Sequence, residues 1–188
     1  MKNKIGKILI ILGWIFVIIS FLMVLYTYYE VNNAYIIANE VLNKVDLMID
    51  RQQFENLEEV EILGEKYIGI IEVPSLNVRL PILKECNDEN LKIAPCKYYS
   101  TKNNNAPIII AGHNYPKFFG NIKYLKKGDS ISFSSLNGNE HRYIVDKIEM
   151  ISSEDIDKMI NTEYEFSIFS CNYSKDKRIT VRCIKEEI

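Results

Sequence analysis

Three residues with the side chains needed for acyl transfer lie at the ends of apolar, strand-like segments. Cys171 ends the segment Phe-Ser-Ile-Phe-Ser-Cys at 166–171, and Arg178 opens a second strand-like segment seven residues later. His113 ends the earlier segment Pro-Ile-Ile-Ile-Ala-Gly-His at 107–113. A thiol becomes nucleophilic once an imidazole accepts its proton, and a guanidinium stabilises the oxyanion formed by attack on a carbonyl. The three residue types therefore predict acyl-transfer chemistry through a thioester.

Cys171 competes for the nucleophile's role with Cys86, Cys96 and Cys183. Free cysteines are among the most buried residues, so a buried structural thiol is the alternative for each of them. Cys171 is favoured because it alone stands at a strand-to-loop junction with an arginine downstream. If it stays reduced, a Cys86–Cys96 disulfide and buried free thiols both remain open. Without a Cys-x-x-Cys motif or a histidine at ligand spacing, the sequence predicts no metal site and no cofactor.

The histidine and the arginine also have competitors. His141 lies among polar residues next to an Asn-Gly turn, which predicts a solvated side chain. His113 follows Gly112 at the end of a buried strand and is the better acid–base candidate. Strand alternation places Arg178 and Arg182 on one face, so Arg182 is a weak competitor for the same role.

The N-terminal segment predicts a membrane anchor. Residues 8–29 contain no charge, and a helix of that length matches the hydrocarbon core of a bilayer. Three lysines lie in residues 1–7, so these residues are expected in the cytoplasm and the rest of the chain outside. The apolar run is too long for a cleaved signal peptide and lacks a small-residue cleavage site. We expect a single-pass protein in the cell membrane.

The remaining chain predicts a helical stalk followed by one β domain. Apolar residues recur at three- and four-residue steps after the anchor, so 30–63 is interpreted as a juxtamembrane helical stalk. Its apolar stripe is expected to pack on the domain, with a second copy of the chain as the alternative. Residues 64–188 contain several short strands with turn signals, which predict a mainly β, closed small barrel with short helices. The formal net charge of −2 argues against nucleic acid as the main partner.

The segments between the expected strands are of three kinds. Residues 84–106 are polar and predict a loop, marked by Asn103-Asn-Asn105, with one or two helical turns after Leu91. Asn137-Gly138 predicts a hairpin turn, and 151–164 predicts a connection with a helical part. The expected strands cover residues 67–73, 76–83, 107–111, 130–134, 141–150, 166–171 and 178–182.

Taken together, these motifs resemble the sortase family of membrane-anchored cysteine transpeptidases of Gram-positive bacteria. The resemblance rests on Ala-Gly-His113, a Phe-Phe pair, Gly-Asp at 128–129, and Ser-Ile-Phe-Ser-Cys171 followed by Arg178. It covers about residues 64–188, and the family's usual Thr-Leu-x-Thr-Cys reads Ser-Ile-Phe-Ser-Cys here. The resemblance implies an eight-stranded barrel in which the catalytic residues are His113, Cys171 and Arg178, supported by Ser170.

The resemblance also implies a reaction and its partners. Cys171 would cleave a sorting signal similar to Leu-Pro-x-Thr-Gly in secreted proteins and pass the acyl group to an amine of a peptidoglycan precursor. No Asp-Pro-aromatic lid motif occurs in 50–66, which favours wall anchoring over pilin polymerisation. Two alternatives are a cell-wall cysteine peptidase, which passes the acyl group to water, and an inactive anchored binding module. Papain-like peptidases place cysteine before histidine, whereas His113 comes first here.

Overall fold

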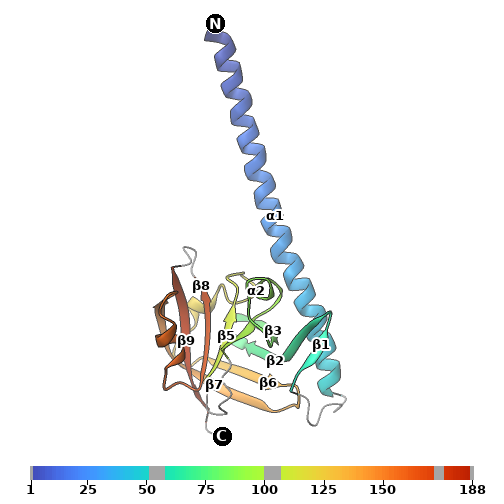
Figure 1. Cartoon of the computed structure of the whole chain (residues 1–188), viewed down its shortest axis with the longest axis vertical. Helices are drawn as coiled ribbons and strands as arrows, with labels where there is room; N and C mark the ends of the chain where they lie inside the picture. The colour runs from blue at the N-terminus through green and yellow to red at the C-terminus, as the bar shows by residue number, and fades with distance from the viewer. Residues whose placement is uncertain (1, 51–57, 100–106, 172–175, 187–188) are drawn as a thin grey trace. The chain divides into compact units, whose positions relative to one another are not determined.

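The computed structural model describes residues 2–50, 58–99, 107–171 and 176–186, and the chain divides into two compact units, Met1–Ala34 and Tyr35–Ile188 (Figure 1). The first unit is the N-terminal part of helix α1 (Lys2–Asp50). Its side chains from residues 4 to 29 are exposed. By length and composition, α1 is suited to cross a membrane.

The second unit is a β-barrel with short helical elements. In the described residues, the helical elements after α1 are η1 (Pro74–Leu76), α2 (Asn90–Ile93), η2 (Ile122–Tyr124) and α3 (Ile156–Ile160). The strands are β1 (Val60–Ile62), β2 (Glu65–Val73), β3 (Val78–Leu83), β4 (Cys96–Tyr99), β5 (Ile108–Gly112), β6 (Ser130–Ser135), β7 (Glu140–Ser152), β8 (Phe166–Cys171) and β9 (Lys177–Lys185).

The sheet closes on itself. Its strand order is β1-β2-β3-β4-β5-β8-β9-β7-β6, and β6 pairs again with β2. The eight strands β2 to β9 therefore form a ring, with β1 pairing to the start of β2 outside it. This arrangement confirms the predicted closed eight-stranded barrel. In a closed ring each strand has a neighbour on both sides, so the backbone groups of these short, apolar strands are not left unpaired at an open sheet edge.

Three neighbouring strands bring distant parts of the sequence to one edge of the barrel (Figure 1). β5 and β8 run parallel, and β8 and β9 run antiparallel. The C-terminal ends of β5 and β8 therefore lie beside the N-terminal end of β9. β5 and β8 are apolar over most of their length and largely buried, because they are covered on both faces.

The second half of α1 belongs to the barrel's core. Val41 and Val45 are completely buried, and they share a hydrophobic cluster with Ile109 of β5 and Phe169 of β8. Arg79 of β3 donates two hydrogen bonds to the Asp46 carboxylate, at 2.5 and 2.7 Å. The apolar stripe predicted after the anchor thus packs on the domain, as expected.

Two sequence-based expectations were wrong in detail. The polar segment 84–106 was predicted as a loop with a helical part, but it contains the strand β4 after the short α2. Strand β1 falls inside 30–63, so the last part of the predicted helical stalk is extended. Residues 51–57 of that stalk and the predicted loop at Asn103-Asn-Asn105 lie outside the described residues. The turn at Asn137-Gly138 is confirmed, with Gly138 at φ 83°.

Candidate active site

The strand register brings the three predicted catalytic residues to adjacent positions. Gly112, the last residue of β5, pairs with Ser170 of β8, so His113 and Cys171 follow the same register position on neighbouring parallel strands. Cys171 pairs in turn with Arg178 across the antiparallel β8–β9 pair. A base, a nucleophile and a cation therefore stand on three adjacent strand ends, although 58 and 7 residues separate them in sequence.

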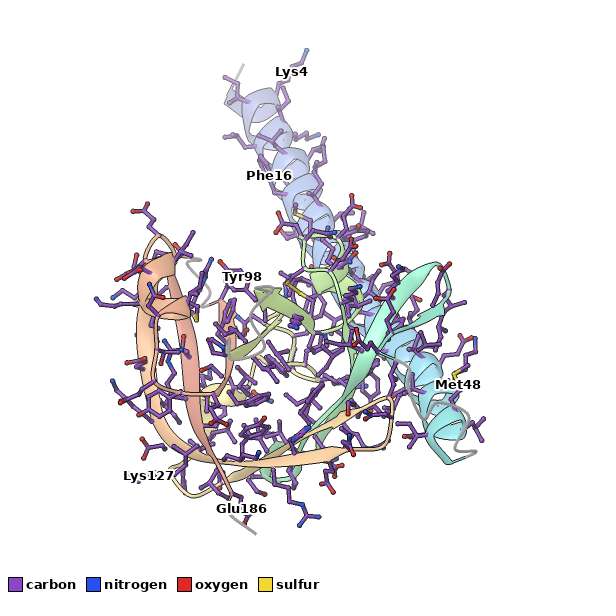
Figure 2. All side chains as sticks on the ribbon, turned by 60° about the horizontal axis from the view of Figure 1, so that its bottom comes forward. Lys4, Phe16, Met48, Tyr98, Lys127 and Glu186 are labelled. Carbon is purple, nitrogen blue, oxygen red and sulfur yellow. A yellow bond between two sulfur atoms is a disulfide. The ribbon has the colours of Figure 1, made fainter. Side chains whose placement is uncertain are left out.

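Bonding and burial distinguish Cys171 from the other three cysteines. Cys86 and Cys96 form a disulfide, seen in Figure 2 as a yellow bond, which settles the alternative left open by the sequence. Cys183 is completely buried, and this burial, with the Asp146 charge as a smaller cause, raises the pKa of its thiol from 9.0 to about 12. Cys171 is free and half-buried at a strand end. It is therefore the cysteine that can act as a nucleophile.

The surroundings of His113 hold its ring and backbone. The imidazole stacks on Tyr115 with ring centroids 4.0 Å apart, and the His113 carbonyl accepts a hydrogen bond from the Phe119 amide at 3.2 Å. A Cβ at Gly112 would lie 2.2 Å from the Phe119 ring, so the glycine is required by this close packing. His141 lies at the far end of β7, opposite Phe133 of β6. The structure therefore separates the competing histidine from Cys171.

Arg178 is held by neutral aromatic groups. Its Nη1 donates a hydrogen bond to the Tyr98 hydroxyl at 3.0 Å. The guanidinium carbon lies 5.0 Å from the Tyr98 ring centroid and 5.1 Å from that of Phe169, within the range of cation–π attraction. The Nε atom is buried and has no hydrogen-bond partner among the described residues. One donor of the guanidinium is therefore not engaged by any described residue.

Arg182, the competing arginine, has a different environment. Its side chain is 2% exposed, and it forms an ion pair with Glu149 at 3.0 Å. It also donates to the Ser167 hydroxyl and to the backbone carbonyls of Lys158 and Met159, at distances between 2.6 and 3.2 Å. All of its nitrogen atoms are engaged with the protein, which indicates a structural role, and Arg178 stays the predicted catalytic arginine.

Ser170, predicted to support catalysis, is almost completely buried, with 1% of its side chain exposed. Its hydroxyl has no hydrogen-bond partner in the described part of the chain. Since successive side chains of a strand point to opposite faces, Ser170 and Cys171 face opposite sides of β8. The supporting role of Ser170 stays a prediction. Because its side chain points away from the face of β8 that carries Cys171, Ser170 would act by supporting the strand and not by contacting a substrate bound at the thiol.

The connection between β7 and β8 is fixed to the barrel at both ends. At its start, the Ser153 amide donates to the Asp176 carbonyl at 2.9 Å, just before the first residue of β9. At its end, the Tyr164 hydroxyl donates to Asp146 at 2.7 Å, and this hydrogen bond raises the pKa of Tyr164 to about 12. Between these points, Arg182 holds two carbonyls of α3. The connection predicted at 151–164 is therefore held against the barrel along its length.

Sequence reasoning did not identify Tyr98, which lies on the unpredicted strand β4 and is labelled in Figure 2. Its partner Arg178 is 80 residues away, so no local pattern could have paired them. In the described residues, no group of three or more His, Cys, Asp or Glu side chains is arranged to hold a metal ion.

The structure combines a closed β-barrel with a free cysteine, a histidine and an arginine on adjacent strand ends, the residue types expected of a cysteine acyltransferase. Comparisons with known proteins give the family. The family model described as "Sortase domain" matches residues 71–186. This match covers more than half of the chain, and the chain therefore belongs to the sortase family.

Individual relatives agree with this assignment. Sortase A of Bacillus anthracis is 30% identical over 113 residues, covering 56% of this chain and 52% of the relative. The chain thus spans about half the length of this curated relative. Among solved structures, sortase A from Corynebacterium diphtheriae superposes with a TM-score of 0.59 at 20% identity, covering 66% of this chain and 62% of that one.

Two further solved structures extend the comparison. Sortase A of Listeria monocytogenes superposes with a TM-score of 0.58 at 26% identity, covering 64% of this chain and 88% of that one. A Clostridium perfringens sortase C, whose structure is described with the C-terminal cell wall sorting motif, gives a TM-score of 0.56 at 21% identity and covers 79% and 91% of the two chains. These two structures match 64% and 79% of the chain.

Proposed function

We propose that this protein is a membrane-anchored cysteine transpeptidase that cleaves a Leu-Pro-x-Thr-Gly-like sorting signal and joins the cleaved protein to an amine of the cell wall. The observation that carries the proposal is the register of β5, β8 and β9, which sets His113, Cys171 and Arg178 on adjacent strand ends. Family membership supports the same chemistry. The solved relative described with a sorting motif supports the substrate class.

In the first half of the reaction, His113 accepts the proton of the Cys171 thiol, the sulfur attacks a backbone carbonyl carbon of the sorting signal, and a tetrahedral oxyanion forms. Arg178 stabilises this oxyanion with its charge and with a donor that no described residue occupies. The intermediate collapses as the peptide C–N bond breaks. His113 donates a proton to the leaving amine, and the acyl group remains on Cys171 as a thioester.

In the second half, an amino group of a peptidoglycan precursor attacks the thioester. His113 accepts the proton that the amine loses, the C–S bond breaks, and a new amide joins the protein to the wall. Helix α1 would anchor the enzyme in the cell membrane, with the N-terminal lysines in the cytoplasm and the barrel outside. Exported proteins and wall precursors are both accessible at that surface.

The test combines the full chain in detergent with a sorting peptide and an amine. Intact mass spectrometry should detect an acyl adduct on the wild-type chain, located on Cys171 by peptide mapping, and no adduct on Cys171→Ala. Adding an amine should divert product from the hydrolysed peptide to a new amide. Hydrolysis that no amine diverts would indicate a cysteine peptidase, and the absence of an adduct with every peptide of a sorting-signal library would indicate a binding module.

A further inference from the structure

The contacts of Tyr98 converge on the arginine of the proposed active site. The Tyr98 hydroxyl accepts a hydrogen bond from Arg178 Nη1 at 3.0 Å, and the two rings of Tyr98 and Phe169 lie 4.9 Å apart at 89°. The guanidinium carbon is close to both rings, at 5.0 and 5.1 Å. Two aromatic side chains and one hydroxyl therefore define the position of the Arg178 head group.

Tyr98 itself stands on a fixed strand. Two residues earlier, Cys96 is completely buried, forms the disulfide with Cys86 and pairs with Ala111 of β5. This covalent and hydrogen-bonded attachment restrains β4 next to the strand that leads to His113. A phenol presented from such a strand loses little entropy when it holds a partner, because its backbone is already immobile.

The neutral character of the Tyr98 contact matters for an oxyanion-stabilising residue. Arg182 on the same strand pairs with the Glu149 carboxylate, which offsets its charge locally. Arg178 is instead held by a phenol oxygen and two ring faces, which orient the guanidinium without cancelling its charge. A fully charged, pre-oriented donor is worth most where negative charge develops during the reaction.

The nitrogen atoms of Arg178 differ in whether they have a hydrogen-bond partner. Nη1 is engaged with Tyr98, whereas Nε is buried and has no partner among the described residues. A buried donor without a partner is costly, and in a native structure it calls for an explanation such as a catalytic role or a bound group. The Tyr98 contact therefore fixes one side of the guanidinium and leaves another for the substrate.

We propose that Tyr98 is a positioning residue that sets Arg178 for stabilisation of the oxyanion formed at Cys171. The proposal rests on the proposed transpeptidase function, and it assigns Tyr98 an effect on the reaction exerted entirely through Arg178. Removing its hydroxyl loosens the guanidinium, and removing its ring as well takes away the cation–π surface.

The kinetic test uses Tyr98→Phe and Tyr98→Leu in the full chain, with Tyr124→Phe as a matched control because Tyr124 is 64% exposed. We expect Tyr98→Phe to lower kcat about tenfold and Tyr98→Leu about 100-fold, with KM nearly unchanged, since the lost interaction acts in the transition state. The control should retain the wild-type rate.

A double-mutant cycle separates positioning from a general structural effect. In an Arg178→Lys background, Tyr98→Phe should change kcat by less than about twofold, because the partner through which it acts is gone. An equal loss in both backgrounds would overturn the proposal. A loss explained by unfolding would appear as a lowered melting temperature of Tyr98→Phe, which we expect to match that of wild type within a few degrees.

A second readout does not depend on activity. Rotation of the Arg178 guanidinium about its Nε–Cζ bond, measured by nuclear magnetic resonance on ¹⁵N-arginine protein and assigned with Arg178→Lys, should be slow in wild type and faster in Tyr98→Phe. Unchanged rotation would overturn the positioning role even if transfer is observed. Faster rotation in the variant of a protein that transfers no peptide would refute the proposed function while upholding the contact.

Discussion

The β8–β9 strand pair carries a cysteine and an arginine at each of its two ends. The side chains at the two ends differ in burial and in their hydrogen-bond partners. At one end, Cys171 pairs with Arg178, both half-buried. At the other, Cys183 and Arg182 are almost completely buried. The same two side-chain types, a few residues apart, are therefore available to a substrate at one end and enclosed at the other.

The difference lies in what surrounds each pair. Arg182 is enclosed by Glu149 of β7 and by the backbone of α3, which together accept its hydrogen bonds. Arg178 lies beside the open strand ends, where its partner is the Tyr98 phenol. The exposure and the bonding of these side chains are thus decided by the elements packed against the strand pair, and residue type alone does not distinguish the two ends.

The largest effect that tests this comparison comes from the two cysteines. Cys171→Ala should lower transfer of a sorting peptide by roughly 10⁴-fold or more, since no other group can form the thioester. Cys183→Ala should leave transfer per folded molecule within about twofold, because its site is remote from the reacting atoms. Transfer is measured as amide product by chromatography. Activity retained in Cys171→Ala and lost in Cys183→Ala would mean that Cys183, and not Cys171, is needed for transfer.

The two arginines should show a reciprocal pattern of activity and stability. Arg178→Met should lower kcat by roughly 10²–10³-fold, the usual cost of removing an oxyanion donor, while changing the free energy of unfolding little. Arg182→Met should instead lower the free energy of unfolding by about 3 kcal/mol, because it leaves Glu149 and several buried acceptors without their partner.

Stability is measured by denaturant titration followed by circular dichroism, and activity is corrected for the folded fraction. The two variants are purified and assayed side by side under the same conditions. If Arg178→Met proved as destabilising as Arg182→Met, the loss of activity would be explained by unfolding, and the distinction between a free and an enclosed guanidinium would be wrong.

Local patterns in the sequence were sufficient to predict much of the fold and to select the three candidate residues, whose catalytic role stays a prediction. The apolar segments around His113 and Cys171 have the length and composition of buried strands, and Asn137-Gly138 carries the chemistry of its own turn. A strand end followed by a loop is visible in one short window. The residues there could be identified without knowing which strands pair.

Features that depend on distant partners could not be predicted in the same way. β4 has four residues and contacts β3 through a single pair, Leu83 and Cys96, so its extended form depends on the surrounding barrel. Alternation placed Arg178 and Arg182 on one face, but their different environments come from Tyr98, Glu149 and α3. The Cys86–Cys96 pairing likewise required the structure.

The smallest predicted effect concerns alkaline stability and again contrasts the two cysteine environments. Burial raises the pKa of the Cys183 thiol from 9.0 to about 12. The unfolded chain therefore releases this proton near pH 9 while the folded chain keeps it, so stability is present below pH 9 and is lost as the pH rises toward 12. Burial raises the pKa of Tyr67 to about 12 as well, which acts in the same direction.

Melting temperatures measured by circular dichroism should fall less steeply above pH 9 in Cys183→Ala than in wild type. Because Tyr67 is present in both proteins, the difference isolates the thiol. Identical slopes would mean that Cys183 is accessible to water, and the enclosed end of the hairpin would then resemble the open one.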